Sequence, residues 1–157
     1  MQSLSQAQRQ DYDRTGYLVI PGMLGESTLA LVRRSIARQV DREAHRLREE
    51  GLIAELFEDL PFTRRLVEVY GPKKSKSIGW NQEVFSREIY ELGTNETILD
   101  VAEDLVGPEL QFNGDYWVRT KLPGESVTTF PWHQDSGYYG DPTDFHIPSL
   151  WIPLVDV

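Results

Sequence analysis

The residue pattern of this chain changes at Gly107-Pro108, and this change is the strongest constraint on its fold. Before it, apolar residues recur at three- and four-residue steps, which is the spacing of amphipathic helices. After it, short runs rich in Val, Trp, Tyr and Thr alternate with polar residues, which is typical of β-strands. Helices that precede strands indicate an α+β fold rather than alternating βαβ units.

The first part of the chain is expected to be mainly helical. The longest helix is predicted over about 27–50, with Ser27 as N-cap and Gly51 as stop. Its apolar stripe comprises Leu29, Val32, Ile36, Val40, Ala44 and Leu47. Further helical segments are predicted over 3–14, over 52–70 with a break at Pro61, and over 95–106 with Asn95 as N-cap. Residues 80–92 have a mixed pattern, and 17–20 is expected to form a short strand.

The second part is expected to be mainly strand. Strands are predicted over 110–113, 115–122, 127–130 and 150–155, with a long loop over 136–148. Along 115–122, Tyr116, Val118 and Thr120 alternate and therefore share one face.

Composition excludes several classes of function. A formal net charge of −9 argues against a nucleic-acid partner, because phosphate binding needs clustered Lys and Arg. The absence of cysteine excludes disulfides, thiolate zinc sites, iron–sulfur clusters and thiol nucleophiles. No apolar run reaches the roughly 18 residues of a membrane span. The polar N-terminus does not resemble a secretory signal. We therefore expect a soluble, cytoplasmic protein with no membrane partner.

The sequence Trp132-His133-Gln134-Asp135 is the clearest candidate for chemistry. Alternate residues of a strand point the same way, so an imidazole nitrogen and a carboxylate oxygen could reach one metal ion. Two histidines and one carboxylate on one face of Fe(II) leave positions open for O₂ and a cosubstrate. A histidine and an aspartate spaced this way also occur simply as a half-buried side chain and a turn residue at a strand end. Both interpretations remain open from the pattern alone.

Several segments together resemble the phytanoyl-CoA dioxygenase family of Fe(II)/2-oxoglutarate-dependent oxygenases. They are YDRTGYLVI at 12–20, the predicted helix 95–106, WVRTKLPG at 117–124, PWHQD at 131–135, and LWIPLVDV at 150–157. Their order along the chain also matches that of the family. The resemblance implies N-terminal helices packed on a double-stranded β-helix, the jelly-roll fold of the cupins. We expect one domain over 1–157, with the helical layer over 1–108 and the first barrel strands over 109–157.

Carried over by position, the resemblance makes His133 and Asp135 two of the iron ligands. It places Trp151 at the 2-oxoglutarate site and makes Tyr116 and Thr120 further contacts of this cosubstrate. The implied partners are O₂ and a small organic substrate. An aspartate at 135 favours hydroxylation, because related halogenating enzymes have a small residue at this position.

The sequence also departs from the family pattern. We find no counterpart of the family's second iron-binding histidine or of the arginine that binds the 2-oxoglutarate carboxylate. His146 does not match the position of that histidine and is expected to be a loop contact. We therefore expect the sequence to be an N-terminal part of an oxygenase and the 157-residue chain alone to be inactive. The alternative is a noncatalytic binding module that retains a partial barrel.

Overall fold

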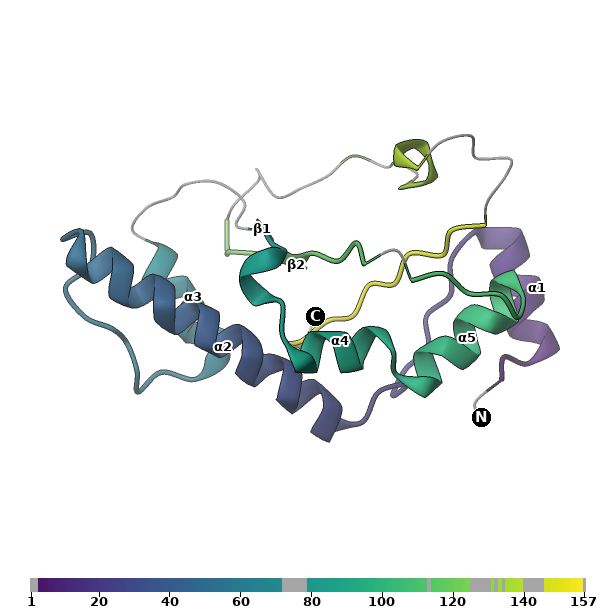
Figure 1. Cartoon of the computed structure of the whole chain (residues 1–157), viewed down its shortest axis with the longest axis horizontal. Helices are drawn as coiled ribbons and strands as arrows, with labels where there is room; N and C mark the ends of the chain where they lie inside the picture. The colour runs from purple at the N-terminus through teal and green to yellow at the C-terminus, as the bar shows by residue number, and fades with distance from the viewer. Residues whose placement is uncertain are drawn as a thin grey trace.

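The computed structural model describes residues 3–71, 79–112, 114–124, 131, 133, 135–139 and 146–156 (Figure 1). Within these residues the α-helices all lie before Gly107: α1 (Gln6–Thr15), α2 (Glu26–Glu49), α3 (Phe62–Tyr70), α4 (Arg87–Gly93) and α5 (Glu96–Val106). Strands β1 (Gly79–Trp80) and β2 (Val118–Arg119) form one antiparallel pair, in which Trp80 lies opposite Val118. Single turns of 3-10 helix occur at η2 (Gln82–Val84) and η3 (Asp135–Tyr138).

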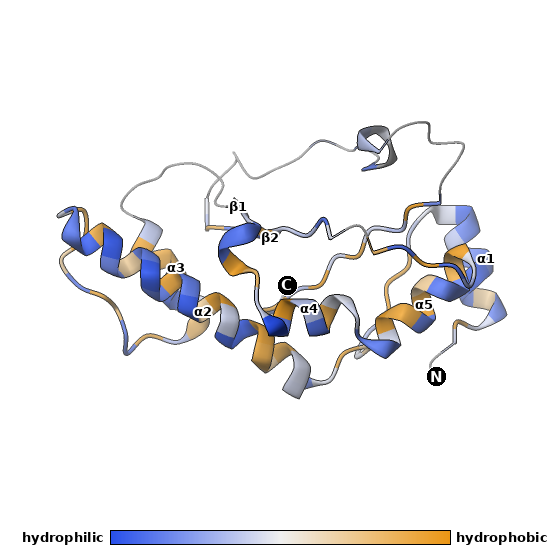
Figure 2. Ribbon diagram, viewed as in Figure 1, coloured by the Kyte–Doolittle hydropathy of each residue, from blue (hydrophilic) through white to orange (hydrophobic). Residues whose placement is uncertain are grey.

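Helix α2 organises the hydrophobic core. It packs against α3, α4 and η2, and its apolar stripe lies between polar faces (Figure 2). The buried core residues are Val32, Ile36, Val40, Ala44, Leu47, Ile53, Val69, Tyr70, Trp80, Val84 and Ile89. The stripe predicted for 27–50 is therefore confirmed, except that Leu29 is only half-buried. The predicted N-cap was wrong by two positions, because the extended residue before the helix is Gly25 rather than Ser27.

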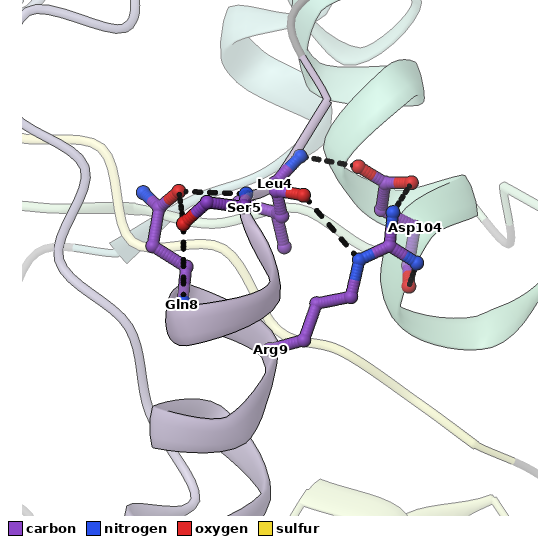
Figure 3. A network of polar contacts seen from close by, with 5 residues as sticks. All are labelled: Leu4, Ser5, Gln8, Arg9 and Asp104. Atoms are coloured by element: carbon purple, nitrogen blue, oxygen red, sulfur yellow. Dashed lines mark hydrogen bonds and ion pairs between the residues drawn. The ribbon is translucent and has the colours of Figure 1, made fainter.

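The N-terminal segment is fastened to α5 by one carboxylate (Figure 3). Asp104 accepts a hydrogen bond from the backbone N–H of Leu4 and pairs with Arg9, whose Nη2 lies 2.6 Å from Oδ1. Ser5 and Gln8 cap the start of α1 reciprocally, which satisfies two backbone N–H groups of its first turn. Leu4 is buried at this contact. The beginning of the chain is thus held against the last α-helix before the change of pattern.

Most segments predicted as strands form no strand within the described residues. Residues 17–20, 110–112 and 150–155 belong to no helix or strand, and only Val118–Arg119 of 115–122 is paired. The predicted strand 127–130 lies outside the described residues. A strand needs a hydrogen-bonding neighbour as well as a suitable pattern, and local sequence does not supply the neighbour. The barrel implied by the family resemblance is accordingly represented, in the described residues, by the β1–β2 pair alone.

Tyr116, Val118 and Thr120, which were predicted to share one face of 115–122, all face inward. Tyr116 and Val118 pack against the core and Thr120 is buried, whereas Asp115, Trp117 and Arg119 are exposed. Over the part of the chain that the structure describes, no helix is long and apolar enough to cross a membrane.

Glu88 links α4 to α2 and is expected to make stability depend on pH. Hydrogen bonds from the backbone at the start of α4, and then from Arg38 on α2, lower the pKa of Glu88 from 4.5 to about 2. The Arg38 Nη2–Glu88 Oε1 distance is 2.8 Å. A carboxylate whose pKa is lower in the folded state stabilises the fold above its unfolded pKa of 4.5, and this contribution is lost as the pH falls toward 2.

The variant Glu88→Gln should therefore be less stable than the unchanged chain at pH 7. The difference in free energy of unfolding should shrink as the pH falls from 4.5 toward 2, and urea titrations across this range would measure it. Arg38→Gln removes one cause of the shift and should reproduce part of the effect. A difference that stays constant with pH would contradict this role of Glu88.

Candidate metal centre

The two residues singled out by the sequence lie together at the start of η3. The Nε2 atom of His133 is 3.3 Å from Oδ1 of Asp135, and both side chains are about half exposed, at 46% and 43%. Two ligands about 2.1 Å from one metal ion and at right angles to each other are about 3.0 Å apart. The observed separation therefore fits adjacent positions in the coordination shell of a single ion.

A backbone carbonyl fixes the tautomer of His133. Its Nδ1 atom lies 2.8 Å from the carbonyl oxygen of Pro131. A carbonyl can only accept a hydrogen bond, so Nδ1 must carry a proton. In neutral imidazole the lone pair then lies on Nε2, the nitrogen that faces Asp135. A proton on Nε2 or a metal ion between the two side chains would stabilise this contact, and a metal-binding histidine commonly donates its other ring N–H to a backbone carbonyl in this way.

The second oxygen of Asp135 is occupied by a neighbour that the sequence analysis missed. Ser149 donates a hydrogen bond from Oγ to Oδ2 of Asp135 at 2.6 Å, across 14 residues of sequence. No periodicity or spacing rule connects these two positions, because they lie 14 residues apart in the sequence. The sequence therefore contains no signal that would have identified Ser149 in advance.

A second contact holds η3 against the segment before β2. The hydroxyl of Tyr139 donates a hydrogen bond to the carboxylate of Asp115. Asp115 directly precedes Tyr116, the first residue of the inward-facing set on this segment. The turn that carries Asp135 is thus held by Tyr139 on one side and by Ser149 on the other. Tyr138 contributes little to this packing, because 78% of its side chain is exposed.

The three predicted cosubstrate contacts occupy different environments. Tyr116 donates a hydrogen bond to the carbonyl of Asn81 at 3.0 Å and stacks on Phe85, with ring centroids 6.3 Å apart. Burial, and then the negative charge of Glu83, raise the pKa of Tyr116, so its phenol stays protonated at neutral pH.

The other two predicted contacts of the cosubstrate differ in exposure, since Thr120 is buried, whereas Trp151 is 72% exposed. The structure therefore brings His133, Asp135 and Ser149 together, and it places Tyr116 against the η2 region.

His146, for which a loop contact is predicted, is exposed at the beginning of the segment 146–156. This segment is the one that carries Ser149 and Trp151. The residues just before His146 lie outside the described part of the chain.

One other group of possible ligands is found among the described residues. Asp41, His45 and Glu58 place ligand atoms within 4.8 Å of one another. However, Oδ1 of Asp41 already pairs with Arg65, whose Nη2 lies 2.7 Å away and whose side chain is only 13% exposed. This fixed positive charge neutralises the carboxylate and opposes a second cation beside it. We therefore assign no metal to this group.

Comparison with known proteins identifies one family for this chain. The family model described as phytanoyl-CoA dioxygenase matches residues 12–157. No significant match is found among curated proteins or solved structures. The matched family consists of Fe(II)/2-oxoglutarate dioxygenases and implies a double-stranded β-helix fold. Because the match extends over nearly the whole sequence, the chain belongs to the phytanoyl-CoA dioxygenase family.

Proposed function

We propose that this chain supplies two iron ligands, His133 and Asp135, to a dioxygenase that uses Fe(II), 2-oxoglutarate and O₂ to hydroxylate a small organic substrate. The observation that carries the proposal is the 3.3 Å separation of His133 Nε2 and Asp135 Oδ1, in a chain whose family uses this chemistry. The hydrogen bond between His133 and Pro131 supports it, because it puts the proton of neutral imidazole on Nδ1 and the lone pair on Nε2, which faces Asp135.

The residues of the chain orient and neutralise the metal. When bound, Fe(II) would supply the site at which O₂, the oxidant for hydroxylation, reacts together with 2-oxoglutarate. His133 would bind the metal through Nε2, and its Nδ1 is held by the Pro131 carbonyl, so the ring cannot turn away without losing that hydrogen bond. Asp135 would contribute a negative charge and fill the position at which related halogenating enzymes have a small residue. Its presence therefore favours hydroxylation over halogenation.

For the cosubstrate, we propose Trp151, Tyr116 and Thr120 as neighbours. Their positions in the family pattern support this assignment, and Tyr116 and Thr120 share one face of the segment that leads to the metal ligands.

A binding experiment without O₂ tests the proposal. Because 2-oxoglutarate would chelate the bound metal, Fe(II) should strengthen its binding to the chain by about tenfold or more in anaerobic calorimetry. Glutarate, which lacks the 2-oxo group, provides the matched control and should show no such gain. If Fe(II) had no effect on 2-oxoglutarate, or the same effect on glutarate, the oxygenase proposal would fail. A noncatalytic binding module would then be the better description.

A further inference from the structure

We propose that Ser149 is a positioning residue that holds the carboxylate of Asp135 in its metal-binding orientation. The inference rests on the proposed function, because it assumes that Asp135 binds the metal. It adds a member to the site that neither the sequence pattern nor the family match assigns.

The two oxygens of Asp135 have different partners. Oδ1 faces Nε2 of His133 at 3.3 Å, and Oδ2 accepts the hydrogen bond from Ser149 at 2.6 Å. With Oδ2 engaged by Ser149, Oδ1 is the oxygen that Asp135 would offer to a metal. Carboxylates that bind metals are commonly fixed by such a neighbouring hydrogen bond.

The segment that carries Ser149 is itself fastened to the helical layer. Nη1 of Arg33 on α2 donates a hydrogen bond to the carbonyl of Leu154 at 3.0 Å, and the same guanidinium pairs with Glu26. The side chain of Leu154 packs against the core. Ser149 is thus five positions before an anchored residue, and its hydroxyl has a defined place from which to hold Asp135.

Without this hydrogen bond the carboxylate would be freer to rotate. The half-exposed side chain of Asp135 would then sample orientations in which Oδ1 no longer faces His133. A metal would have to restrict this freedom on binding, and its affinity would fall accordingly. Changes to such hydrogen-bonded neighbours of a ligand typically weaken metal binding by about 10–100-fold.

The test is a Co(II) titration of the 157-residue chain, read by calorimetry and by the visible ligand-field bands of the metal. Ser149→Ala removes the hydroxyl, and Ser149→Thr keeps it. Ser27→Ala removes an exposed serine from the start of α2 and serves as the matched control. His133→Ala reports whether the metal binds at this site at all. Thermal unfolding of each variant shows whether the fold is retained.

We expect Ser149→Ala to lower Co(II) affinity by about tenfold and to alter the ligand-field bands at saturating metal. Ser149→Thr and Ser27→Ala should behave like the unchanged chain. If Ser149→Ala bound Co(II) with unchanged affinity and bands while His133→Ala lost it, the role of Ser149 would be refuted and the metal site would stand. If His133→Ala still bound the metal normally, the proposed function itself would fail.

Discussion

Replacing His133 with alanine is expected to abolish specific Fe(II) binding by this chain. The imidazole is held with Nε2 toward Asp135, and its loss removes one of the two proposed ligands and leaves only the carboxylate. Loss of a hydrogen-bonded neighbour of a ligand typically lowers metal affinity by roughly 10–100-fold. Removal of the ligand itself should lower the Fe(II) affinity by more than this. Asp135→Ala should have a comparable effect, because it removes the negative charge as well as the second ligand. Anaerobic calorimetry with Fe(II) would measure both variants.

His45→Ala supplies the control for this experiment. His45 is an exposed histidine on α2, and it belongs to the group with Asp41 and Glu58 to which we assign no metal. The variant should bind Fe(II) as the unchanged chain does. Retained binding in His133→Ala combined with loss in His45→Ala would move the metal to the α2 group and overturn our assignment.

Replacing Leu47 with alanine is expected to destabilise the fold by about 2–5 kcal/mol. Leu47 is fully buried on α2, at 0% exposure, and belongs to the core formed with α3, α4 and η2. Truncation removes apolar contacts and leaves a cavity that the surrounding helices cannot fill completely. For a chain of this size the thermal midpoint should fall on the order of 10 °C, as measured by circular dichroism.

Leu52→Ala makes the same chemical change at a position that is 47% exposed. Leu52→Ala should lower the free energy of unfolding much less than Leu47→Ala does, because water already contacts a large part of the side chain and truncation leaves a smaller cavity. Equal losses of stability at Leu47 and Leu52 would show that the core is not organised around α2 as described.

The helices could be predicted from the sequence because their signals are local. The stripe along 27–50 and the N-cap at Asn95 depend on residues within a few positions of one another, and both are confirmed within one or two residues at the helix boundaries. The apolar spacing along 95–106 predicts a buried face of Ile98, Leu99, Ala102, Leu105 and Val106. This prediction was less accurate, since the buried residues of the helix are Ile98 and Val101. Which apolar residues of a half-buried helix become buried depends on the element against which the helix packs.

The sheet and the surroundings of the site could not be predicted from the sequence as well as the helices could. Alternation identified the inward face of 115–122, but pairing with Gly79–Trp80 depends on a distant segment. At the site, spacing suggested that His133 and Asp135 could meet. The contributions of Pro131 and Ser149 depend on where a loop places a carbonyl and a hydroxyl. Such contacts between irregular segments leave no repeating pattern in a sequence.

The arrangement of contacts around α2 also has a consequence for how the protein is made. The helices that pack on α2 follow it along the chain and precede His133 and Asp135, the proposed metal ligands. The helical layer can therefore assemble before residues 131–156 leave the ribosome. The hydrogen bond from Arg33 to Leu154 spans 121 residues and must close afterwards. Helix α2 would then already present a folded surface on which the segment with Ser149 docks. Synthesis from the N-terminus would thus build the support for the site before the site itself.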